Sequence, residues 1–234
     1  MTAEPDSTIV QLTDVTKVYR QGKVDVHALR GLTFEIAKGE FTAICGPSGS
    51  GKTTALNLIG ALDHPTSGTV VLEGNDLSQL NRRELSALRR DRIGFVFQAY
   101  NLIPVLTAYE NAETVMWVQR VDVEERRRRV MELLAAVGLE GLETRKPSEL
   151  SGGQQQRVAI ARAIAANPAI VLADEPTANV DSETADKLIG IMERLNREQG
   201  VTFLFSTHDP RVMERAHRLV RMVDGNVAND ERRA

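Results

Sequence analysis

The residues best suited to chemistry begin with a glycine-rich run over residues 46–53, which has the sequence Gly-Pro-Ser-Gly-Ser-Gly-Lys-Thr. The run fits the pattern G-x-x-x-x-G-K-[ST] and lies between a strand-like apolar segment and a helix-like segment. Glycines allow successive backbone N–H groups to surround phosphate oxygens, and a helix N-terminus adds further donors. Lys52 can place its charge on the β- and γ-phosphates, and the Thr53 hydroxyl can ligate Mg²⁺. The predicted phosphate-binding residues are Gly46, Pro47, Ser48, Gly49, Ser50, Gly51, Lys52, Thr53 and Thr54.

Two carboxylates, Asp174 and Glu175, end a second apolar run over residues 169–173. Acidic groups at the end of a buried strand are costly unless a cation or a reacting water lies beside them. We therefore predict that Asp174 holds Mg²⁺ and that Glu175 polarises an attacking water. The alternative is a solvated acidic turn, which the phosphate-binding loop on the same chain makes the weaker interpretation.

A third motif, Leu-Ser-Gly-Gly-Gln, covers residues 150–154 at the start of a helix-like segment. Backbone N–H groups at the positive end of a helix can bind an anion. The same residues are compatible with a serine N-cap followed by flexible glycines, which is the better interpretation of an isolated case. This case is not isolated, because Ser151 precedes Asp174 by 23 residues.

The elements that must position these motifs alternate between strand and helix. Strands are predicted at residues 9–19, 32–36, 41–45, 69–72, 169–173 and 201–206, where Val, Ile, Thr and other apolar residues are concentrated. Helices are predicted at residues 52–62, from 153 onward, at 182–198 and from 210, and residues 221–227 suggest a closing hairpin. Between residues 99 and 150 only helical periodicity is found. An α/β domain interrupted by a helical insertion explains this order.

Composition restricts the class of function. The 234 residues are 42% hydrophobic and 26% charged, which is typical of a soluble globular domain. With 29 basic and 32 acidic side chains, a net charge of −3 disfavours nucleic acid as a partner. The single cysteine, Cys45, excludes an internal disulfide, and His27, His64 and His217 have no ligand spacing, so no zinc site is predicted. Residues 1–6 are not a secretory signal, and residues 93–109 are too polar to span a bilayer.

With the three motifs in this order, the chain resembles the ATP-binding-cassette (ABC) ATPases over nearly its whole length. The Leu-Ser-Gly-Gly-Gln motif ahead of a strand that ends in Asp-Glu carries most of the resemblance. The resemblance implies an α/β fold: an ABC-type P-loop ATPase core with an N-terminal antiparallel β subdomain and an inserted α-helical subdomain. In these terms the chain is one domain, 1–234, with the core and β subdomain at 1–98 and 151–234 and the helical subdomain at 99–150.

The resemblance also implies roles for further residues. Tyr19 occupies the place of the aromatic residue that stacks on adenine, and Gln98 matches a glutamine that contacts Mg²⁺ and water. His208 occupies the place of a histidine that faces the γ-phosphate. Tyr19 is also compatible with a strand-edge aromatic and His208 with a neighbour of a helix cap. Together, catalysis is assigned to Glu175, His208 and Lys52, metal binding to Thr53, Gln98 and Asp174, and nucleotide contacts also to Tyr19, Gln98, Ser151, Gly152, Gly153 and Asp181.

The implied cofactors are ATP and Mg²⁺, and the implied first partner is a second copy of the chain. In the family, each ATP lies between the phosphate loop of one subunit and the Ser-Gly-Gly motif of the other. Because Glu175 and His208 are both present, we expect a competent hydrolase. Ala178 replaces a more common glycine, a mild departure.

Residues 98–104 and 62–68 are similar to the lipoprotein-release and macrolide-export group of this family. That similarity implies a separate permease with four membrane helices and a large periplasmic domain, docked beside residues 98–104. It places the chain in the cytoplasm, peripheral on the inner face of the cytoplasmic membrane. Two alternatives are a permease that signals or acts in cell division without transport, and a soluble ABC ATPase. The second is disfavoured by the absence of a long heptad repeat between Lys52 and Ser151.

Two surface features receive structural interpretations. The run Glu-Glu-Arg-Arg-Arg-Arg over residues 124–129 suits a membrane surface, but its spacing favours an exposed helix with Glu124–Arg128 and Glu125–Arg129 pairs. Trp117 is predicted to lie in the core of the helical segment.

Overall fold

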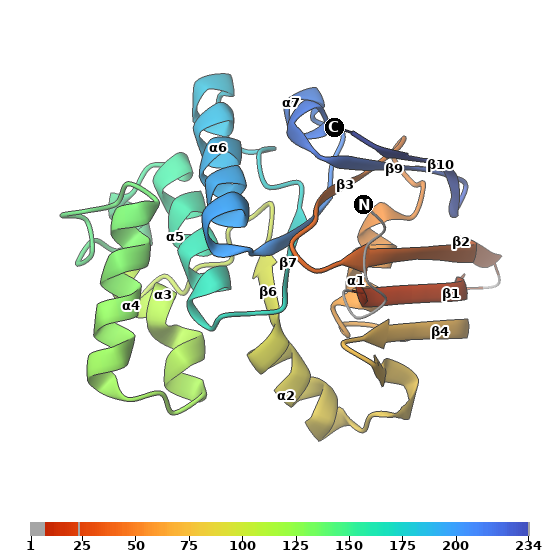
Figure 1. The fold of residues 1–234 in the computed structure, drawn as a ribbon, viewed down its shortest axis with the longest axis horizontal. Helices are drawn as coiled ribbons and strands as arrows, with labels where there is room; N and C mark the ends of the chain where they lie inside the picture. The colour runs from red at the N-terminus through yellow and green to blue at the C-terminus, as the bar shows by residue number, and fades with distance from the viewer. Residues whose placement is uncertain (1–7, 23, 234) are drawn as a thin grey trace.

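Two β-sheets meet in the computed structural model, which describes residues 8–22 and 24–233 (Figure 1). The antiparallel sheet has the order β2-β1-β4-β5, and the six-stranded sheet has the order β10-β9-β3-β8-β7-β6. In the second sheet β9, β3, β8, β7 and β6 run parallel, and β10 pairs antiparallel with β9. The strands are β1 Thr8–Gln21, β2 Val24–Ala37, β3 Phe41–Cys45, β4 Ser67–Leu72, β5 Asn75–Asp76, β6 Ile93–Val96, β7 Ile170–Asp174, β8 Thr202–Ser206, β9 Arg218–Val223 and β10 Asn226–Arg232.

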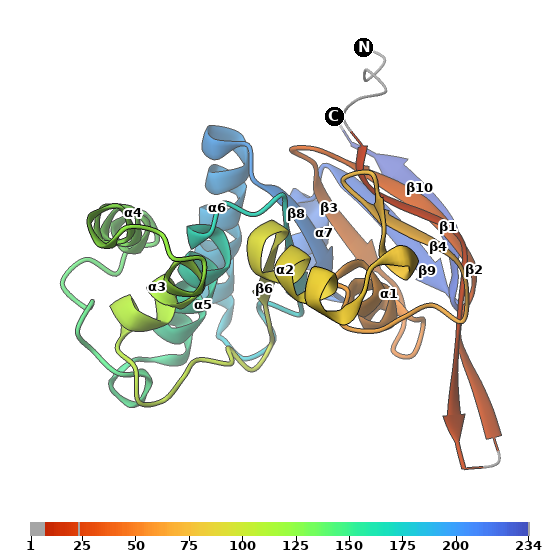
Figure 2. The same cartoon turned by 90° about the horizontal axis from the view of Figure 1, so that it is seen from below.

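The helices divide into a group near the sheets and a group at the far end of the molecule. Helix α1 lies beside the antiparallel sheet, whereas α3 and α4 lie at the opposite end, beyond α5 (Figures 1 and 2). The helices are α1 Lys52–Ile59, α2 Arg82–Arg92, α3 Ala108–Val118, α4 Val123–Ala136, α5 Gly152–Ala165, α6 Ser182–Gln199 and α7 Pro210–Arg215, with short 3₁₀ turns at Leu77–Gln79 and Pro147–Glu149. The α/β fold predicted from the sequence is thus confirmed.

The central strands of the six-stranded sheet are buried on both faces, as β3 illustrates, whereas the edge strand β10 is largely exposed. Successive side chains of a strand point to opposite faces. Phe41, Ala43 and Cys45 accordingly join a cluster with α3–α6, and Ile44 joins a second cluster with α1 and the antiparallel sheet. In the first cluster Phe41 lies 4.7 Å from Phe205 between ring centroids. Burial on both faces explains why this strand is apolar apart from Thr42, which is also buried.

Parallel strands bring their carboxyl ends to one edge of the sheet. The glycine-rich loop follows β3, Asp174 ends β7, and Thr207 and His208 follow β8. Gln98 follows β6 by two residues. The topology therefore collects groups from four strands at one place.

Several predicted elements differ in the structure. Helix α1 ends at Ile59 rather than at residue 62, because Gly60 caps it and Ala61 takes a left-handed φ of 52°. Strands β1 and β2 are longer than predicted and form a hairpin that projects from the molecule (Figure 2). Helix α2 and strand β6 were not predicted, because α2 buries only Leu85 and β6 has 4 residues.

The interpretations of the two surface features were wrong in part. Trp117 is 64% exposed and does not belong to the core. Arg128 pairs with Glu125 and Glu132, and Arg129 donates to the Ala165 carbonyl oxygen at 2.6 Å. The predicted Glu125–Arg129 pair failed because Arg129 faces α5 rather than solvent, and the predicted Glu124–Arg128 pair is replaced by the pair of Arg128 with Glu125.

No helix within the described ranges is long and apolar enough to cross a bilayer. The predicted non-secretory character of residues 1–6 concerns a segment outside those ranges.

Candidate active site

A cavity of about 680 Å³ opens at the carboxyl edge of the six-stranded sheet. Its floor is the glycine-rich loop and the start of α1, one end is formed by β1 and β2, and the other by residues that follow β6, β7 and β8. The lining residues are Tyr19, Val26, His27, Ala28, Gly46, Pro47, Ser48, Gly49, Gly51, Lys52, Thr53, Thr54, Gln98, Glu175 and His208. Most of the predicted site residues are therefore brought together by the fold.

The glycine-rich loop has a backbone that requires glycine at two close approaches. Gly46 has a φ of 150°, and a Cβ there would overlap the carbonyl oxygen of Met222. Gly51 has a φ of 99°, and a Cβ there would lie 2.6 Å from the Ala28 carbonyl oxygen. Lys52, only 9% exposed, donates from Nζ to the Gly46 carbonyl oxygen at 2.9 Å. The ammonium group therefore lies across the loop, where a phosphate would meet it.

The residues expected to bind a metal supply oxygen atoms from two elements. The Thr53 hydroxyl at the start of α1 donates to Asp174 Oδ1 at the end of β7, at 3.2 Å. Hydroxyl and carboxylate oxygens suit Mg²⁺, which is usually held by one or two carboxylates together with phosphate oxygens. No group of three or more His, Cys, Asp or Glu side chains that could hold a metal occurs in the described part of the chain. The donor set fits Mg²⁺ bound with a nucleotide, and Gln98 lines the same cavity.

Glu175 is held by the residues that follow β8. His208 Nδ1 lies 2.7 Å from Glu175 Oε1, and the Thr207 hydroxyl donates to Oε2 at 3.2 Å. The Glu175 backbone has a left-handed φ of 46°, and its N–H donates to the Ser206 carbonyl oxygen at 2.9 Å. The Glu175 side chain is 18% exposed, whereas that of His208 is 75% exposed. The carboxylate is thus oriented by its neighbours, and the imidazole remains accessible.

The Ser-Gly-Gly motif and Asp181 are absent from the lining of the cavity as far as the described residues show it. Ser151 instead caps α5, where its hydroxyl accepts from the Gln154 N–H at 3.3 Å. Asp181 caps α6 by accepting from the Thr184 N–H at 2.9 Å. Ser151 is nevertheless exposed, so it is available to another molecule.

A bridge that sequence reasoning missed joins the segment after β6 to the segment after β7. The Asn179 side chain donates to the Gln98 carbonyl oxygen at 2.9 Å, and the Tyr100 hydroxyl donates to the Asn179 carbonyl oxygen at 3.1 Å. Arg162 of α5 donates to the Tyr100 carbonyl oxygen at 2.9 Å. Tyr100 and Asn101 both have positive φ angles, which these bonds support. No sequence motif signals such contacts.

The end of the cavity formed by β1 and β2 contains a second set of contacts that no motif signals. The Tyr19 hydroxyl donates to Asp63 Oδ2 at 2.8 Å, and Lys17 Nζ donates to Asp63 Oδ1 at 2.7 Å. Burial raises the pKa of the Tyr19 phenol, and the hydrogen bond to Asp63 raises it further. Burial alone would raise the pKa of Asp63, but hydrogen bonds from Lys17, Tyr19 and the His64 N–H outweigh it and lower the pKa.

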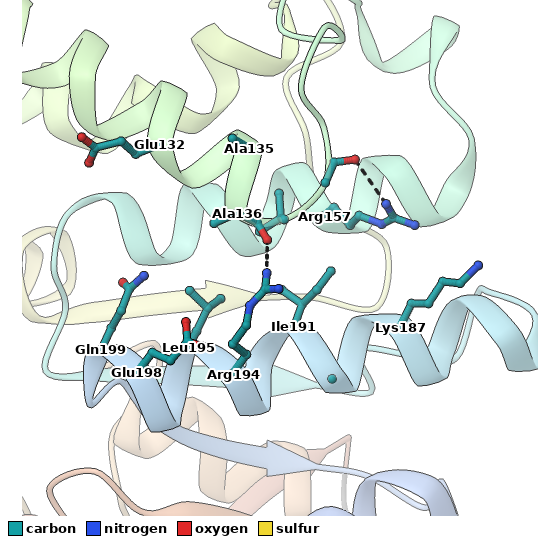
Figure 3. A pocket seen from close by; sticks show the side chains of 13 residues that line it. Glu132, Ala135, Ala136, Arg157, Lys187, Ile191, Arg194, Leu195, Glu198 and Gln199 are labelled. Atoms are coloured by element: carbon teal, nitrogen blue, oxygen red, sulfur yellow. Dashed lines mark hydrogen bonds between the residues drawn. The ribbon is translucent and has the colours of Figure 1, made fainter.

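A larger hollow of about 760 Å³ lies between α4, α5 and α6 (Figure 3). Arg194 of α6 donates to the Ala136 carbonyl oxygen, and Arg157 of α5 donates to that of Gly138 at 3.4 Å. Both arginines therefore stabilise the carboxyl end of α4, where the helix dipole favours a cation. None of the predicted site residues lines this hollow.

The family model described as ABC transporter matches residues 29–178. An uncharacterized ABC transporter ATP-binding protein of Thermotoga maritima is 47% identical over 225 residues, covering 96% of each chain. The lipoprotein-releasing system ATP-binding protein LolD of Anaeromyxobacter dehalogenans is 46% identical over 230 residues, covering 97% of this chain and 96% of that one. The macrolide export ATP-binding/permease protein MacB of Syntrophobacter fumaroxidans is 46% identical over 219 residues, which cover 93% of this chain but 31% of that protein.

Solved structures show the same likeness. A Methanocaldococcus jannaschii ATP-binding cassette, solved as a dimer in a post-hydrolysis state with ADP and Pi, superposes with a TM-score of 0.88. It is 46% identical, and the match covers 96% of this chain and 98% of that one.

Proposed function

The chain belongs to the ABC transporter family, as an ATP-hydrolysing subunit, and on that premise we propose that two copies close around two ATP molecules to drive a separate membrane permease. One observation carries the proposal. The phosphate loop, Glu175 and His208 line the cavity, and Asp174 is bonded to Thr53 of that lining, while the exposed Ser151 of the same chain lies outside it. Each site is then completed by Ser151, Gly152 and Gly153 of the other copy, with Asp181 at the same interface. ATP thereby favours closure, and hydrolysis releases it.

In the proposed site each residue has a distinct task. The Glu175 carboxylate orients a water molecule for attack on the γ-phosphorus, and His208 faces the departing γ-phosphate. Lys52 and the loop N–H groups neutralise charge on the phosphates, and Tyr19 stacks on adenine. Mg²⁺, held by the Thr53 hydroxyl, Asp174 and Gln98, would supply further positive charge at the β- and γ-phosphates.

The first experiment compares the wild-type chain with Glu175→Gln and Lys52→Ala in the presence of Mg²⁺ and ATP. Removal of a general base costs about 100-fold or more in rate. We therefore expect Glu175→Gln to lose turnover by at least that factor but to accumulate as an ATP-bound dimer in size-exclusion chromatography. Lys52→Ala should fail to bind the nucleotide and remain monomeric. Hydrolysis by Glu175→Gln at a near wild-type rate would remove Glu175 from the proposed role.

The site for the permease is proposed to be a second cavity of about 410 Å³ between β6 and α3. It is mostly apolar, with Leu62, Phe95 and Val115 in its lining, and Asn101 connects it to the segment after β6. Trp117 and Val118 are 64% and 49% exposed on the last turn of α3 beside it. An exposed tryptophan next to an apolar cavity favours protein contact. We expect a helix of a permease of the lipoprotein-release or macrolide-export type to dock here, at the inner face of the cytoplasmic membrane.

The docking proposal is tested by capture from solubilised membranes with tagged Glu175→Gln protein and Mg·ATP, followed by mass spectrometry. A permease with four membrane helices and a large periplasmic domain should be recovered. Adding Trp117→Ser should reduce its recovery by about tenfold, the loss expected for a central interface residue. Val24→Ser is the matched control, because Val24 is 63% exposed on the distant β hairpin. Equal recovery with Trp117→Ser would contradict the docking site, and recovery of soluble repair or ribosomal components would contradict the permease.

A further inference from the structure

Three side chains at the adenine end of the cavity form a closed cluster that the phosphate chemistry does not use. Asp63 accepts from the Tyr19 hydroxyl with one carboxylate oxygen and from Lys17 Nζ with the other. Lys17 Nζ also donates to the His64 carbonyl oxygen at 2.7 Å and lies 4.8 Å from the centroid of the Tyr19 ring. The phenol is therefore held through its hydroxyl by Asp63, and the ammonium lies near its π-system.

The cluster is less solvated than the ion pairs on the surface. The Lys17 and Asp63 side chains are 12% and 30% exposed, compared with 57% and 46% for the exposed Arg128–Glu125 pair. Charge pairs withdrawn from water are screened less and hold a more definite geometry. Lys17 and Tyr19 are two residues apart on β1 and therefore lie on the same face of the strand. Tyr19 itself lines the nucleotide cavity.

Helix α1 connects this cluster to the phosphate loop. The helix begins at Lys52 and has 8 residues, and Asp63 follows four residues after its last residue, Ile59. At 1.5 Å per residue such a helix is about 12 Å long. The chain after Asp63 then follows β1, where the Thr66 N–H donates to the Thr16 carbonyl oxygen at 2.8 Å. Asp63, which holds the Tyr19 hydroxyl, and the phosphate loop thus lie at the two ends of one short helix.

The strand that bears Tyr19 needs such an anchor. The pairing of β1 with β2 shifts register between Lys17 and Val18, which leaves Ala28 as an extra residue on β2. The Ala28 carbonyl oxygen lies against Gly51 of the phosphate loop and so fixes that part of β2. The outer end of the hairpin, where β2 is exposed over residues 24–27, projects from the molecule (Figure 2). Tyr19 lies on the projecting side of the bulge, paired with Val26.

From these contacts we propose that Asp63 and Lys17 are positioning residues that hold the Tyr19 ring at a set distance from the phosphate loop and thereby govern the binding of the adenine base. The proposal rests on the role proposed for Tyr19 in adenine stacking. A carboxylate and an ammonium that never touch the nucleotide then contribute to its affinity. They do so through the base alone, because the phosphates are bound by Lys52 and the loop N–H groups.

The experiment separates the two halves of the ligand. Isothermal titration calorimetry measures binding of Mg·ADP and of Mg·pyrophosphate to the wild-type chain, Asp63→Asn, Lys17→Met and Tyr19→Phe. Asparagine matches aspartate in size, but its amide can accept only at one oxygen, and phenylalanine keeps the ring but removes the hydroxyl. Base stacking on an aromatic side chain changes affinity by about fivefold to 100-fold. We expect the Kd for ADP to rise at least fivefold in each variant and the Kd for pyrophosphate to remain within twofold of wild type.

Two reference variants complete the test. Tyr19→Ala should weaken ADP binding at least as much as Asp63→Asn does. Glu132→Gln, which breaks an exposed pair with Arg128, should leave the binding of both ligands unchanged. Unchanged ADP binding in Asp63→Asn, with weakened binding in Tyr19→Ala, would overturn the positioning role and leave the stacking role intact. Equal weakening of ADP and pyrophosphate would also overturn it, because the effect would then reach the phosphate loop. Unchanged ADP binding in Tyr19→Ala would instead contradict the stacking role in the proposed function.

Discussion

At the residue scale, Arg218 shows how one buried charge can organise a surface edge of the sheet. The residue is 5% exposed, and its guanidinium donates to both carboxylate oxygens of Asp230, at 2.8 and 2.7 Å. It also donates to Glu40 Oε2 at 2.9 Å and to the Glu35 carbonyl oxygen at 2.7 Å. Removing one partner of a buried pair leaves the other partner desolvated and without compensation.

We therefore expect Arg218→Met to lower the free energy of unfolding by about 3 kcal/mol. Arg128→Met is the matched control, because Arg128 makes two ion pairs in which all the side chains are at least 46% exposed. Its loss should cost less than about 1 kcal/mol. Urea unfolding of the three proteins measures both values, and equal losses would show that burial does not matter at Arg218.

The pair of Arg218 with Asp230 also makes the stability of the fold depend on pH. The hydrogen bond from Arg218 is the main cause that lowers the pKa of Asp230, against the effect of burial. A carboxyl group whose pKa is lower in the folded state stabilises the fold above its ordinary pKa of about 4, and that stabilisation is lost as the pH falls through the folded value. The difference in free energy of unfolding between wild type and Arg218→Met should accordingly become smaller below about pH 4.

The site residues that could be identified from the sequence are those that belong to a short local motif. Gly46 and Lys52 follow from the spacing within the glycine-rich run, and Asp174 follows from its place at the end of an apolar run, because each belongs to one short segment. Asp63 is 46 residues from Lys17 in the chain and has no motif, so only the fold reveals the contact. Trp117 was misplaced for a related reason, since periodicity indicates a face of a helix but not what covers that face.

At the element scale, the loop before α3 depends on one side chain. Asn111 is fully buried, and its amide donates to the carbonyl oxygens of Ile103, Leu106 and Thr107 at 3.0–3.1 Å. Its Oδ1 accepts from the Ile103 N–H at 2.7 Å. The loop begins beside the cavity proposed for the permease, where Phe97 and Asn101 belong to the lining, so Asn111 shapes that surface without touching it.

Asn111→Leu should lower the free energy of unfolding by about 2–3 kcal/mol, because it leaves several buried backbone groups unsatisfied. Asn226→Leu, at the exposed first residue of β10, should change it by less than about 0.5 kcal/mol. Hydrogen exchange should accelerate at residues 101–107 and remain slow in β7. Unchanged exchange at residues 101–107 would show that other contacts hold the loop.

Elements were predictable from sequence where packing agreed with local pattern. Strands β3, β7 and β8 are buried on both faces and therefore mostly apolar, and α6 has a capping aspartate and a terminal glycine, Gly200. Helix α2 has only a narrow apolar face, made by Leu85 and Leu88, and its capping box of Asn81 and Glu84 was the clearer signal. The long β1–β2 hairpin was underestimated because its outer half is stabilised by pairing rather than by burial.

At the scale of the whole molecule, two hydrophobic clusters share the six-stranded sheet as a common wall. One cluster joins that sheet to α1 and the antiparallel sheet, which form part of the proposed nucleotide site, and the other joins it to α3–α6, which bear the Ser151 motif and the proposed permease surface. The family could be assigned from the order of motifs. The separation of Ser151 from the phosphate loop could not be derived from spacing, because it depends on how the two clusters lie on the sheet.

The short helix between the phosphate loop and Asp63 also restricts how this sequence can evolve. Each added residue in a helix advances the chain by 1.5 Å and turns it by about 100°. A single insertion or deletion within Lys52–Ile59 would carry Asp63 away from Lys17 and Tyr19, whereas substitutions on the exposed side of the helix would not. Residues of this segment that do not contact the nucleotide can thus be substituted, whereas its length is fixed. Insertions and deletions are expected elsewhere in the chain.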